Sequence, residues 1–269
     1  MKHERIYLME GNEDAYLDTY IADPIPSFTR KALLIIPGGG YGKICSEREG
    51  EPIAHAFMPY GYNAFVLHYT VGRKKPFPAQ LIEATLAIKH IKDNAENYGI
   101  DPEQLFVVGF SAGGHLAAST GVLWKNDEVL KAVAMPYGET KPRGVMLIYP
   151  VISPKFQNHI KSFRNLWCTD TPTEEQLSAA AIEQHVDADS APAFIMHTAN
   201  DQVVDVRNAL TVADAYAQAQ IPFELHIYPD GPHGMALGNR ITECGTPKYN
   251  QSAIAEWVRL AANWADTLS

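Results

Sequence analysis

A serine between two glycines is the first feature of the sequence that could do chemistry. Residues 109–113 read Gly-Phe-Ser-Ala-Gly, a G-x-S-x-G pattern that composition alone produces in roughly one chain in ten of this length. An apolar run at 105–108 precedes the pattern, and small residues typical of a helix follow it. This strand–turn–helix context puts the Ser111 hydroxyl on a strained turn at a helix N-terminus, where negative charge is favoured. It favours a nucleophilic serine over an incidental serine in a glycine-rich turn.

A serine hydroxyl needs a base, and that base needs a carboxylate to orient it. The predicted strand at 193–198 leads into Asp201, and the predicted strand at 223–228 leads into a loop of glycine and proline around His233. Parallel strands end at one edge of a sheet, so these side chains can meet Ser111 there. The sequence therefore predicts a Ser–Asp–His arrangement in that chain order, with Ser111 as nucleophile, Asp201 as orienting acid and His233 as base.

Other acids and histidines compete for these roles. Asp205 follows Asp201 by four residues, and its position before a helical segment suits a cap, so Asp201 is preferred. His197 and His226 lie inside predicted strands, and His115 lies in the helix after the serine, where structural histidines are common. The spacing of the histidines matches no HExxH or HxxxH pair, so neither a metal nor a cofactor is expected.

A glycine loop follows the predicted strand at 32–36. Residues 37–42 read Pro-Gly-Gly-Gly-Tyr-Gly, and glycines without side chains let backbone N–H groups approach a ligand closely. The sequence around the loop matches neither the P-loop nor the dinucleotide-binding pattern. An oxyanion hole fits better, with one N–H from this loop and one from Ala112, the residue after the serine. The alternative is that the glycines only turn the chain.

The rest of the chain alternates short apolar runs with helical patterns, which is typical of βα units around a mostly parallel sheet. We therefore expect an α/β fold, a single domain over residues 1–269 with a central sheet flanked by helices. The predicted strands are 32–36, 64–69, 105–110, 144–149, 193–198 and 223–228. The predicted helices are 80–98, 112–123, 206–218 and 251–267.

One long segment, 151–191, interrupts this alternation with prolines and aromatic residues. It follows the strand at 144–149, which is counted as the sixth strand of the fold. Connections of this length within compact domains are usually functional, so a lid or cap insertion is one interpretation. A packed surface excursion is the other.

The amino-acid composition limits which classes of molecule the protein is expected to bind. The 22 Lys and Arg against 31 Asp and Glu give a net charge of 22 − 31 = −9 without a basic run, which disfavours nucleic acid and anionic membranes. A small-molecule ester substrate is expected instead, and a homodimer is compatible with the sequence. Three cysteines outside any CxxC pattern are expected to be reduced thiols. Neither a signal peptide nor an apolar span is recognisable, so a cytoplasmic location is expected.

The sequence resembles the α/β-hydrolase-fold esterases related to acetyl-xylan esterases and to the hormone-sensitive-lipase and kynurenine-formamidase group. By position, the resemblance implies Ser111 as nucleophile, His233 as base and Asp201 as its orienting acid. The segments that carry it are LLIIPGGGYG at 33–42, YGYNAFVLHY at 60–69, VVGFSAGGHL at 107–116, AFIMHTANDQVV at 193–204 and HIYPDGPHG at 226–234.

The same resemblance implies oxyanion donors at Gly39 or Gly40 together with Ala112. The sequence departs from the group at one position, because Pro37 stands where the typical H-G-G-G loop begins with histidine. This departure leaves open which glycine donates. Serine at position 111 also separates the chain from the dienelactone-hydrolase relatives, which use a cysteine nucleophile.

Together these patterns predict a serine carboxylesterase that hydrolyses short acyl esters, acetyl esters above all, through an acyl-enzyme. Acetylated sugars or xylo-oligosaccharides are the substrates that the resemblance implies, and Tyr41 and Trp167 are expected to stack on a sugar or line the acyl pocket. Two alternatives stay open. The same triad could cleave another bond, as in an arylformamidase or a peptidase, or the chain could be a non-catalytic binding protein on a hydrolase scaffold.

Overall fold

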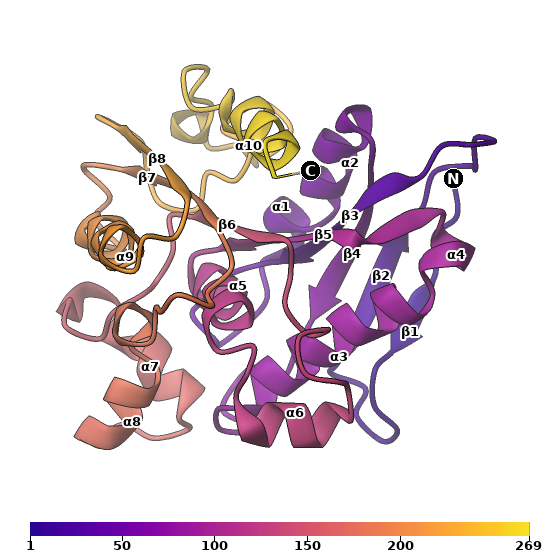
Figure 1. Ribbon diagram of the computed structural model, residues 1–269. Coiled ribbons are helices and arrows are strands. Elements are labelled where there is room, and N and C mark those ends of the chain that lie inside the picture. The colour runs from indigo at the N-terminus through magenta and orange to yellow at the C-terminus, as the bar shows by residue number, and fades with distance from the viewer. Residues whose placement is uncertain (269) are drawn as a thin grey trace.

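One eight-stranded sheet forms the centre of the molecule in the computed structural model, which describes residues 1–268 (Figure 1). The strands lie in the order β1-β2-β4-β3-β5-β6-β7-β8. All neighbours from β4 to β8 are parallel, whereas β1 and β2 join the sheet antiparallel at one edge. The strand bounds are Arg5–Tyr7 for β1, Tyr16–Tyr20 for β2, Arg30–Ile36 for β3, Tyr62–His68 for β4, Ile100–Phe110 for β5, Gly144–Ile148 for β6, Ala193–Thr198 for β7 and Phe223–Tyr228 for β8.

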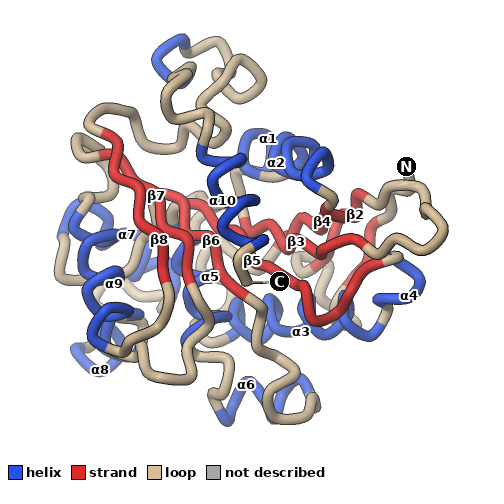
Figure 2. The backbone as a smooth tube through the Cα atoms, turned by 45° about the horizontal axis from the view of Figure 1, so that its top comes forward, coloured by secondary structure: helices blue, strands red, loops and turns tan. Residues whose placement is uncertain are grey.

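Helices cover both faces of this sheet (Figure 2). One face carries α1 (Ser46–Glu49), α2 (Glu51–Phe57) and α10 (Trp257–Asp266). The other face carries α3 (Ala79–Asp93), α4 (Ala95–Tyr98), α5 (Ala112–Val122), α6 (Asp127–Val133) and α9 (Arg207–Gln218). No helix within residues 1–268 has both the length and the apolar character needed to cross a bilayer.

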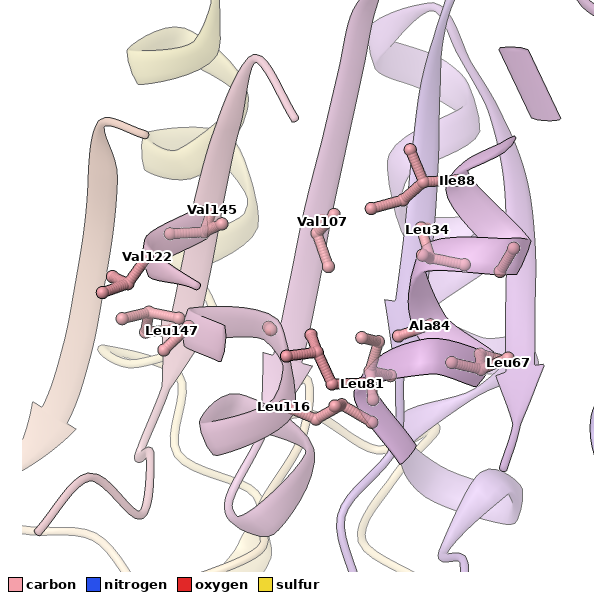
Figure 3. Close-up of a cluster of buried hydrophobic side chains, with 14 of the residues drawn as sticks. Leu34, Leu67, Leu81, Ala84, Ile88, Val107, Leu116, Val122, Val145 and Leu147 are labelled. Atoms are coloured by element: carbon pink, nitrogen blue, oxygen red, sulfur yellow. The ribbon is translucent and has the colours of Figure 1, made fainter. Parts of the chain in front are cut away.

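The two helical layers bury two separate apolar clusters. Successive side chains of a strand point to opposite faces, so β3 supplies Leu34 to one cluster and Ile35 to the other. Leu34 packs with Leu81 of α3 and Leu116 of α5 (Figure 3). The central strands are consequently buried on both faces, which explains why they are almost continuously apolar in sequence. The sheet is therefore a rigid platform for the loops at its edge.

The insertion after β6 contains α7 (Ile160–Leu166) and α8 (Glu174–Ala179), which lie next to α9 (Figure 1). It is tied to the body of the protein by its own backbone. The Leu166 carbonyl accepts a hydrogen bond from Phe77 N–H at 3.0 Å, and the Ala180 carbonyl lies 2.7 Å from His115 Nε2. Movement of this segment as a lid stays a prediction.

The six predicted strands correspond to β3 through β8, with ends that differ by a few residues for the first four. Strands β1 and β2 were not predicted. The predicted helix 80–98 is two helices, because the chain turns at Asn94, whose side-chain amide donates to the carbonyl of His90 at 2.8 Å. The predicted helix 251–267 begins only at Trp257, after a run of turns.

Candidate active site

The turn between β5 and α5 holds Ser111 in a strained conformation, with φ 53° and ψ −119°. A Cβ on Gly109 would overlap the carbonyl oxygen of Gly113, and a Cβ on Gly113 would overlap that of Ile36. The two glycines therefore let strand and helix approach this closely. The Ser111 N–H donates to Ile148 O at 3.0 Å, so the backbone of Ser111 is fixed on the neighbouring strand.

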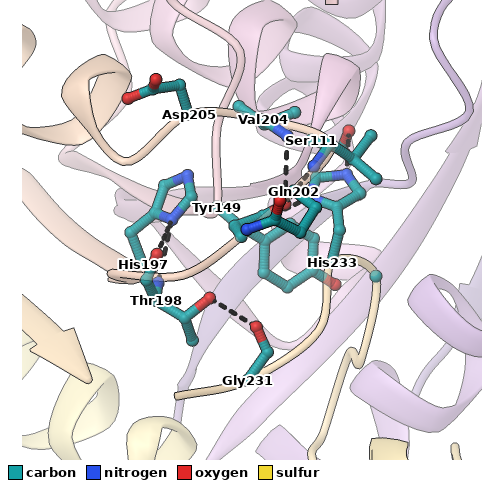
Figure 4. Close-up of polar contacts among 12 residues, drawn as sticks. Ser111, Tyr149, His197, Thr198, Gln202, Val204, Asp205, Gly231 and His233 are labelled. Carbon is teal, nitrogen blue, oxygen red and sulfur yellow. Dashed lines mark hydrogen bonds and ion pairs between the residues drawn. The ribbon is translucent and has the colours of Figure 1, made fainter. Parts of the chain in front are cut away.

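His233 and Asp201 complete a continuous hydrogen-bonded chain with this serine. Figure 4 shows His233 beside Ser111. Ser111 Oγ lies 2.8 Å from His233 Nε2, and His233 Nδ1 lies 2.7 Å from Asp201 Oδ2. The carboxylate accepts from Nδ1–H, which leaves Nε2 as the acceptor for the serine hydroxyl. The three predicted residues thus meet at one edge of the sheet, from the ends of β5, β7 and β8.

The Asp201 carboxylate is buried and held on both oxygens. Its Oδ1 accepts from Val203 N–H at 2.8 Å and from Val204 N–H at 3.0 Å, while Oδ2 faces His233. Burial raises the pKa of this carboxyl, but the hydrogen bond and charge of His233 and the two backbone donors outweigh burial. The net effect is a pKa below the ordinary value, so Asp201 is ionised in the neutral range.

The competing residues lie elsewhere. Asp205 pairs with Arg207 at 2.7 Å and accepts from its backbone N–H at 2.9 Å, at the start of α9. Figure 4 shows its carboxylate turned away from His233. His226 faces Glu224 on the surface of β8. His115 contacts the Tyr41 hydroxyl and the Ala180 carbonyl, and burial lowers its pKa to about 4. The competing acid and both of these histidines are therefore held by partners outside the Ser111 cluster.

The glycine loop contains two candidate backbone donors for an oxyanion hole, the N–H groups of Gly39 and Gly40. Gly39 has φ 130° and Gly40 has φ 63°, conformations that side chains disfavour. Within residues 1–268 the N–H groups of Gly39, Gly40 and Ala112 donate to no acceptor, and both glycines line the same cavity as Ser111. Asn165 of the insertion donates to the Gly40 carbonyl at 2.8 Å and so holds the loop from outside.

Ser111 opens onto a cavity of about 660 Å³. Neither predicted stacking residue lines it. Tyr41 is 2% exposed, and its hydroxyl donates to His115 Nδ1 at 2.8 Å, whereas Trp167 packs edge-on against Phe77. Tyr41 belongs to one of the two apolar clusters, and Trp167 packs against that cluster. The structure does not bring Tyr41 or Trp167 to the serine.

Several residues of the cavity were missed from the sequence. They come from the segment after the glycine loop, from the insertion and from the loop before α10: Lys43, Arg48, Glu49, Asn158, Lys161, Ser162, Asn165 and Tyr249. Tyr249 is the aromatic ring that the cavity does contain. It stands in a stretch of turns without periodicity, so no pattern marks it. One sequence feature could have pointed to Glu49 as a site residue: it is acidic, directly precedes a glycine and lies close to the glycine loop.

The loop that carries His233 is anchored from three directions. Arg48 donates to the Gly234 carbonyl at 2.7 Å, and Trp257 of α10 donates from Nε1 to the Ala236 carbonyl at 3.0 Å. The Ala236 N–H in turn donates to the Tyr149 hydroxyl at 3.0 Å. The loop of His233 is therefore held by contacts from three separate segments of the chain.

A substitution of Gly39 tests which glycine acts as a donor. We expect Gly39→Ala to lower kcat by about 10²-fold or more, because the new Cβ would overlap the Lys43 carbonyl and displace the N–H. Gly138→Ala is the matched control, since Gly138 also has a left-handed backbone, φ 93°, but open space around it. Both variants lose stability from the strained alanine, and only one should lose activity. Full activity in folded Gly39→Ala would move the donor to Gly40.

Comparisons with known proteins show which family the chain resembles. The BD-FAE family model matches residues 17–216. The chain is 38% identical over 215 residues to endo-1,4-beta-xylanase B of Butyrivibrio fibrisolvens, covering 78% of this chain and 33% of that protein. It is 28% identical over 216 residues to the acetylxylan esterase of Xylanibacter ruminicola, covering 77% of this chain and 42% of that protein. The chain thus spans less than half the length of these curated relatives.

A solved structure is similar over nearly its whole length. The acetyl ester-xyloside bifunctional hydrolase from Caldicellulosiruptor lactoaceticus superposes with a TM-score of 0.82 at 30% identity, covering 98% of this chain and 96% of that one. The strand order, the insertion after the sixth strand and this likeness confirm the predicted α/β-hydrolase fold. With the family match over most of its residues, the chain belongs to the BD-FAE family.

Proposed function

We propose that this protein is a serine carboxylesterase that hydrolyses short acyl esters, acetyl esters of sugars or xylo-oligosaccharides above all, through an acyl-enzyme. One observation carries the proposal: the unbroken chain from Ser111 Oγ through His233 to the buried Asp201 carboxylate, opening onto a cavity. A serine with an oriented base and unoccupied backbone donors beside it is the arrangement that acyl transfer requires.

Acylation uses each of these groups in turn. Ser111 Oγ attacks the ester carbonyl carbon while His233 Nε2 takes the hydroxyl proton. The carbonyl oxygen becomes an oxyanion, which accepts from the N–H of Ala112 and from that of Gly39 or Gly40. The bond to the alcohol oxygen then breaks, and the His233 imidazolium gives its proton to that oxygen. Asp201 stabilises the imidazolium while it exists.

Deacylation repeats the steps with water. His233 takes a proton from water as its oxygen attacks the acyl carbon, and the same backbone donors stabilise the second oxyanion. Collapse breaks the bond to Ser111 Oγ, which recovers its proton from His233. The products are the free acid and the unmodified enzyme.

The preference for a sugar ester rests on the relatives and on the cavity. Two relatives are named for acetyl esters, the acetylxylan esterase and the acetyl ester-xyloside hydrolase. The cavity is lined by groups that can hydrogen-bond to hydroxyls, such as Asn158 and Ser162, and by the ring of Tyr249. Sugars are commonly bound by such polar groups and an aromatic ring.

Hydrolysis of p-nitrophenyl acetate, butyrate and octanoate, with acetate release from acetylated xylo-oligosaccharides, tests the proposal. We expect kcat/KM to fall with acyl length and the acetylated oligosaccharides to be deacetylated. An aryl formamide and a peptide p-nitroanilide are assayed in parallel. Octanoate turned over as fast as acetate contradicts the short-acyl preference, and cleavage of only the formamide or the peptide would assign the triad to another bond.

A further inference from the structure

A second buried carboxylate lies beside the catalytic groups, and the steps above do not use it. Glu49 is only 2% exposed, although its side chain contributes to the cavity that contains Ser111. Its Oε2 accepts from Gly38 N–H at 2.8 Å, and its Oε1 accepts from the Tyr149 hydroxyl at 2.9 Å. Burying a carboxylate this deeply costs free energy unless hydrogen bonds replace those lost to water. Its two hydrogen bonds therefore show which parts of the protein it holds together.

The first contact fixes the glycine loop against the nucleophile. Gly38 directly precedes the candidate donor Gly39, and it packs tightly on the serine turn. A Cβ built on Gly38 would lie 2.5 Å from the carbonyl oxygen of Phe110 and 3.0 Å from the Cβ of Ser111. The loop therefore has no room to move toward the serine, and the bond to Glu49 keeps it from moving away.

The second contact reaches the base. The Tyr149 hydroxyl donates to Glu49 and accepts from Ala236 N–H, three residues after His233. The Tyr149 ring also lies edge-on to the His233 imidazole, with ring centroids 5.0 Å apart. Figure 4 shows the ring beneath the imidazole. One carboxylate thus joins the loop with the oxyanion donors to the loop with the base.

We propose that Glu49 is a positioning residue that holds the oxyanion loop, through Gly38, and the histidine loop, through Tyr149, in register with Ser111. This role rests on the proposed esterase function. The hydrogen bonds of its carboxylate go to Gly38 and Tyr149 rather than to Ser111 or His233, so it acts by keeping donors and base at the distances that the transition state needs.

Glutamine cannot replace this carboxylate, because both groups that face it are donors. The Gly38 N–H is fixed, and the Tyr149 oxygen already receives the Ala236 N–H. An amide has one oxygen, so its NH₂ group would face one of these donors and leave it without an acceptor. Burial raises the pKa of Glu49 above its ordinary value, while the Gly38 and Tyr149 hydrogen bonds oppose that shift.

Glu83 supplies a matched control. It is 1% exposed and accepts from Thr70 N–H at 2.7 Å and from Asn12 Nδ2 at 2.9 Å, but it is outside the lining of the catalytic cavity. Glu83→Gln therefore produces the same mismatch in a buried site that holds other loops. A loss of stability that both variants share measures the structural cost of the substitution. A loss of kcat that occurs only in Glu49→Gln measures the positioning effect.

We expect Glu49→Gln to lower kcat for p-nitrophenyl acetate by about 10²-fold, the usual cost of misplaced catalytic groups, with KM changed by less than about 3-fold. Glu83→Gln should keep kcat within about 3-fold of the parent protein. Equal kcat values in the two variants would overturn the proposal. If Glu49→Gln does not fold, Tyr149→Phe replaces it, and retention of full kcat there overturns the link to the histidine loop.

Hydrogen exchange of the amides at residues 38–42 gives a readout that needs no substrate. The loop amides should exchange faster in Glu49→Gln and at the parent rate in Glu83→Gln, because only the first variant loses the anchor of Gly38. Unchanged exchange in Glu49→Gln overturns the positioning role even if the esterase is confirmed. Absence of turnover by the parent protein, with faster exchange in the variant, would overturn the proposed function alone.

Discussion

Ser111→Ala is expected to reduce ester hydrolysis by about 10⁵-fold or more, to the background of surface groups, because it removes the hydroxyl that faces His233 Nε2. The fold should be unaffected, since the hydroxyl contributes one hydrogen bond at a surface that opens onto the cavity. Rates with p-nitrophenyl acetate and butyrate, measured beside the thermal unfolding midpoint, check both statements. Acetate alone is insufficient because surface histidines cleave it slowly.

Ser119→Ala controls for the loss of a serine hydroxyl nearby. Ser119 lies on the same helix, is fully buried, and donates only to the His115 carbonyl at 2.8 Å. It should keep parent activity. A fluorophosphonate probe gives the same comparison by mass, with labelling of the parent and of Ser119→Ala only. Full activity in folded Ser111→Ala would remove the serine mechanism altogether.

Asp201→Asn should lower kcat by about 10⁴-fold, because the backbone dictates how the amide is oriented. The amide oxygen must stay at the Oδ1 position, where the N–H groups of Val203 and Val204 donate. Its NH₂ group then faces His233 Nδ1 and forces the proton onto Nε2. In that tautomer Nε2 cannot accept the serine proton.

Asp205→Asn is the matched control four residues away. Its carboxylate pairs with Arg207 at the exposed start of α9, so kcat should stay within about 3-fold of the parent value and only stability should fall slightly. Steady-state kinetics of the two variants, with circular dichroism to confirm folding, decides between them. A larger loss in Asp205→Asn would reassign the orienting acid.

Much of this site could be predicted from sequence because it follows from the strands. Fully buried parallel strands such as β7 are mostly apolar runs, and the candidate residues lie in the loops that follow the strands, as Asp201 follows β7 and His233 follows the partly exposed edge strand β8. Glycines at 109 and 113 leave a visible pattern because a Cβ cannot be accommodated there. A position whose backbone surroundings leave room only for glycine can therefore be recognised in the sequence.

The rest is set by tertiary contacts that leave no local pattern. Strands β1 and β2 are short, and neither Arg-Ile-Tyr in β1 nor Tyr-Leu-Asp-Thr-Tyr in β2 forms the continuous apolar run that marks the buried parallel strands. Tyr41 was expected in the cavity, but its ring is buried because its hydroxyl finds His115, a partner 74 residues away. The buried position of Glu49 likewise depends on a hydrogen bond from Tyr149, which lies 100 positions later in the chain.

The three anchors of the histidine loop determine when the site can exist during folding. Arg48, Tyr149 and Trp257 come from the beginning, middle and end of the chain, so the loop is held only after all three regions have docked. The contacts of Arg48 and Tyr149 span 186 and 87 positions, and contacts of such long sequence separation form late, because closing large loops costs entropy before it yields stabilisation. A chain whose sheet has formed but whose α10 has not docked lacks the Trp257 anchor, so we expect esterase activity to appear only once α10 has docked.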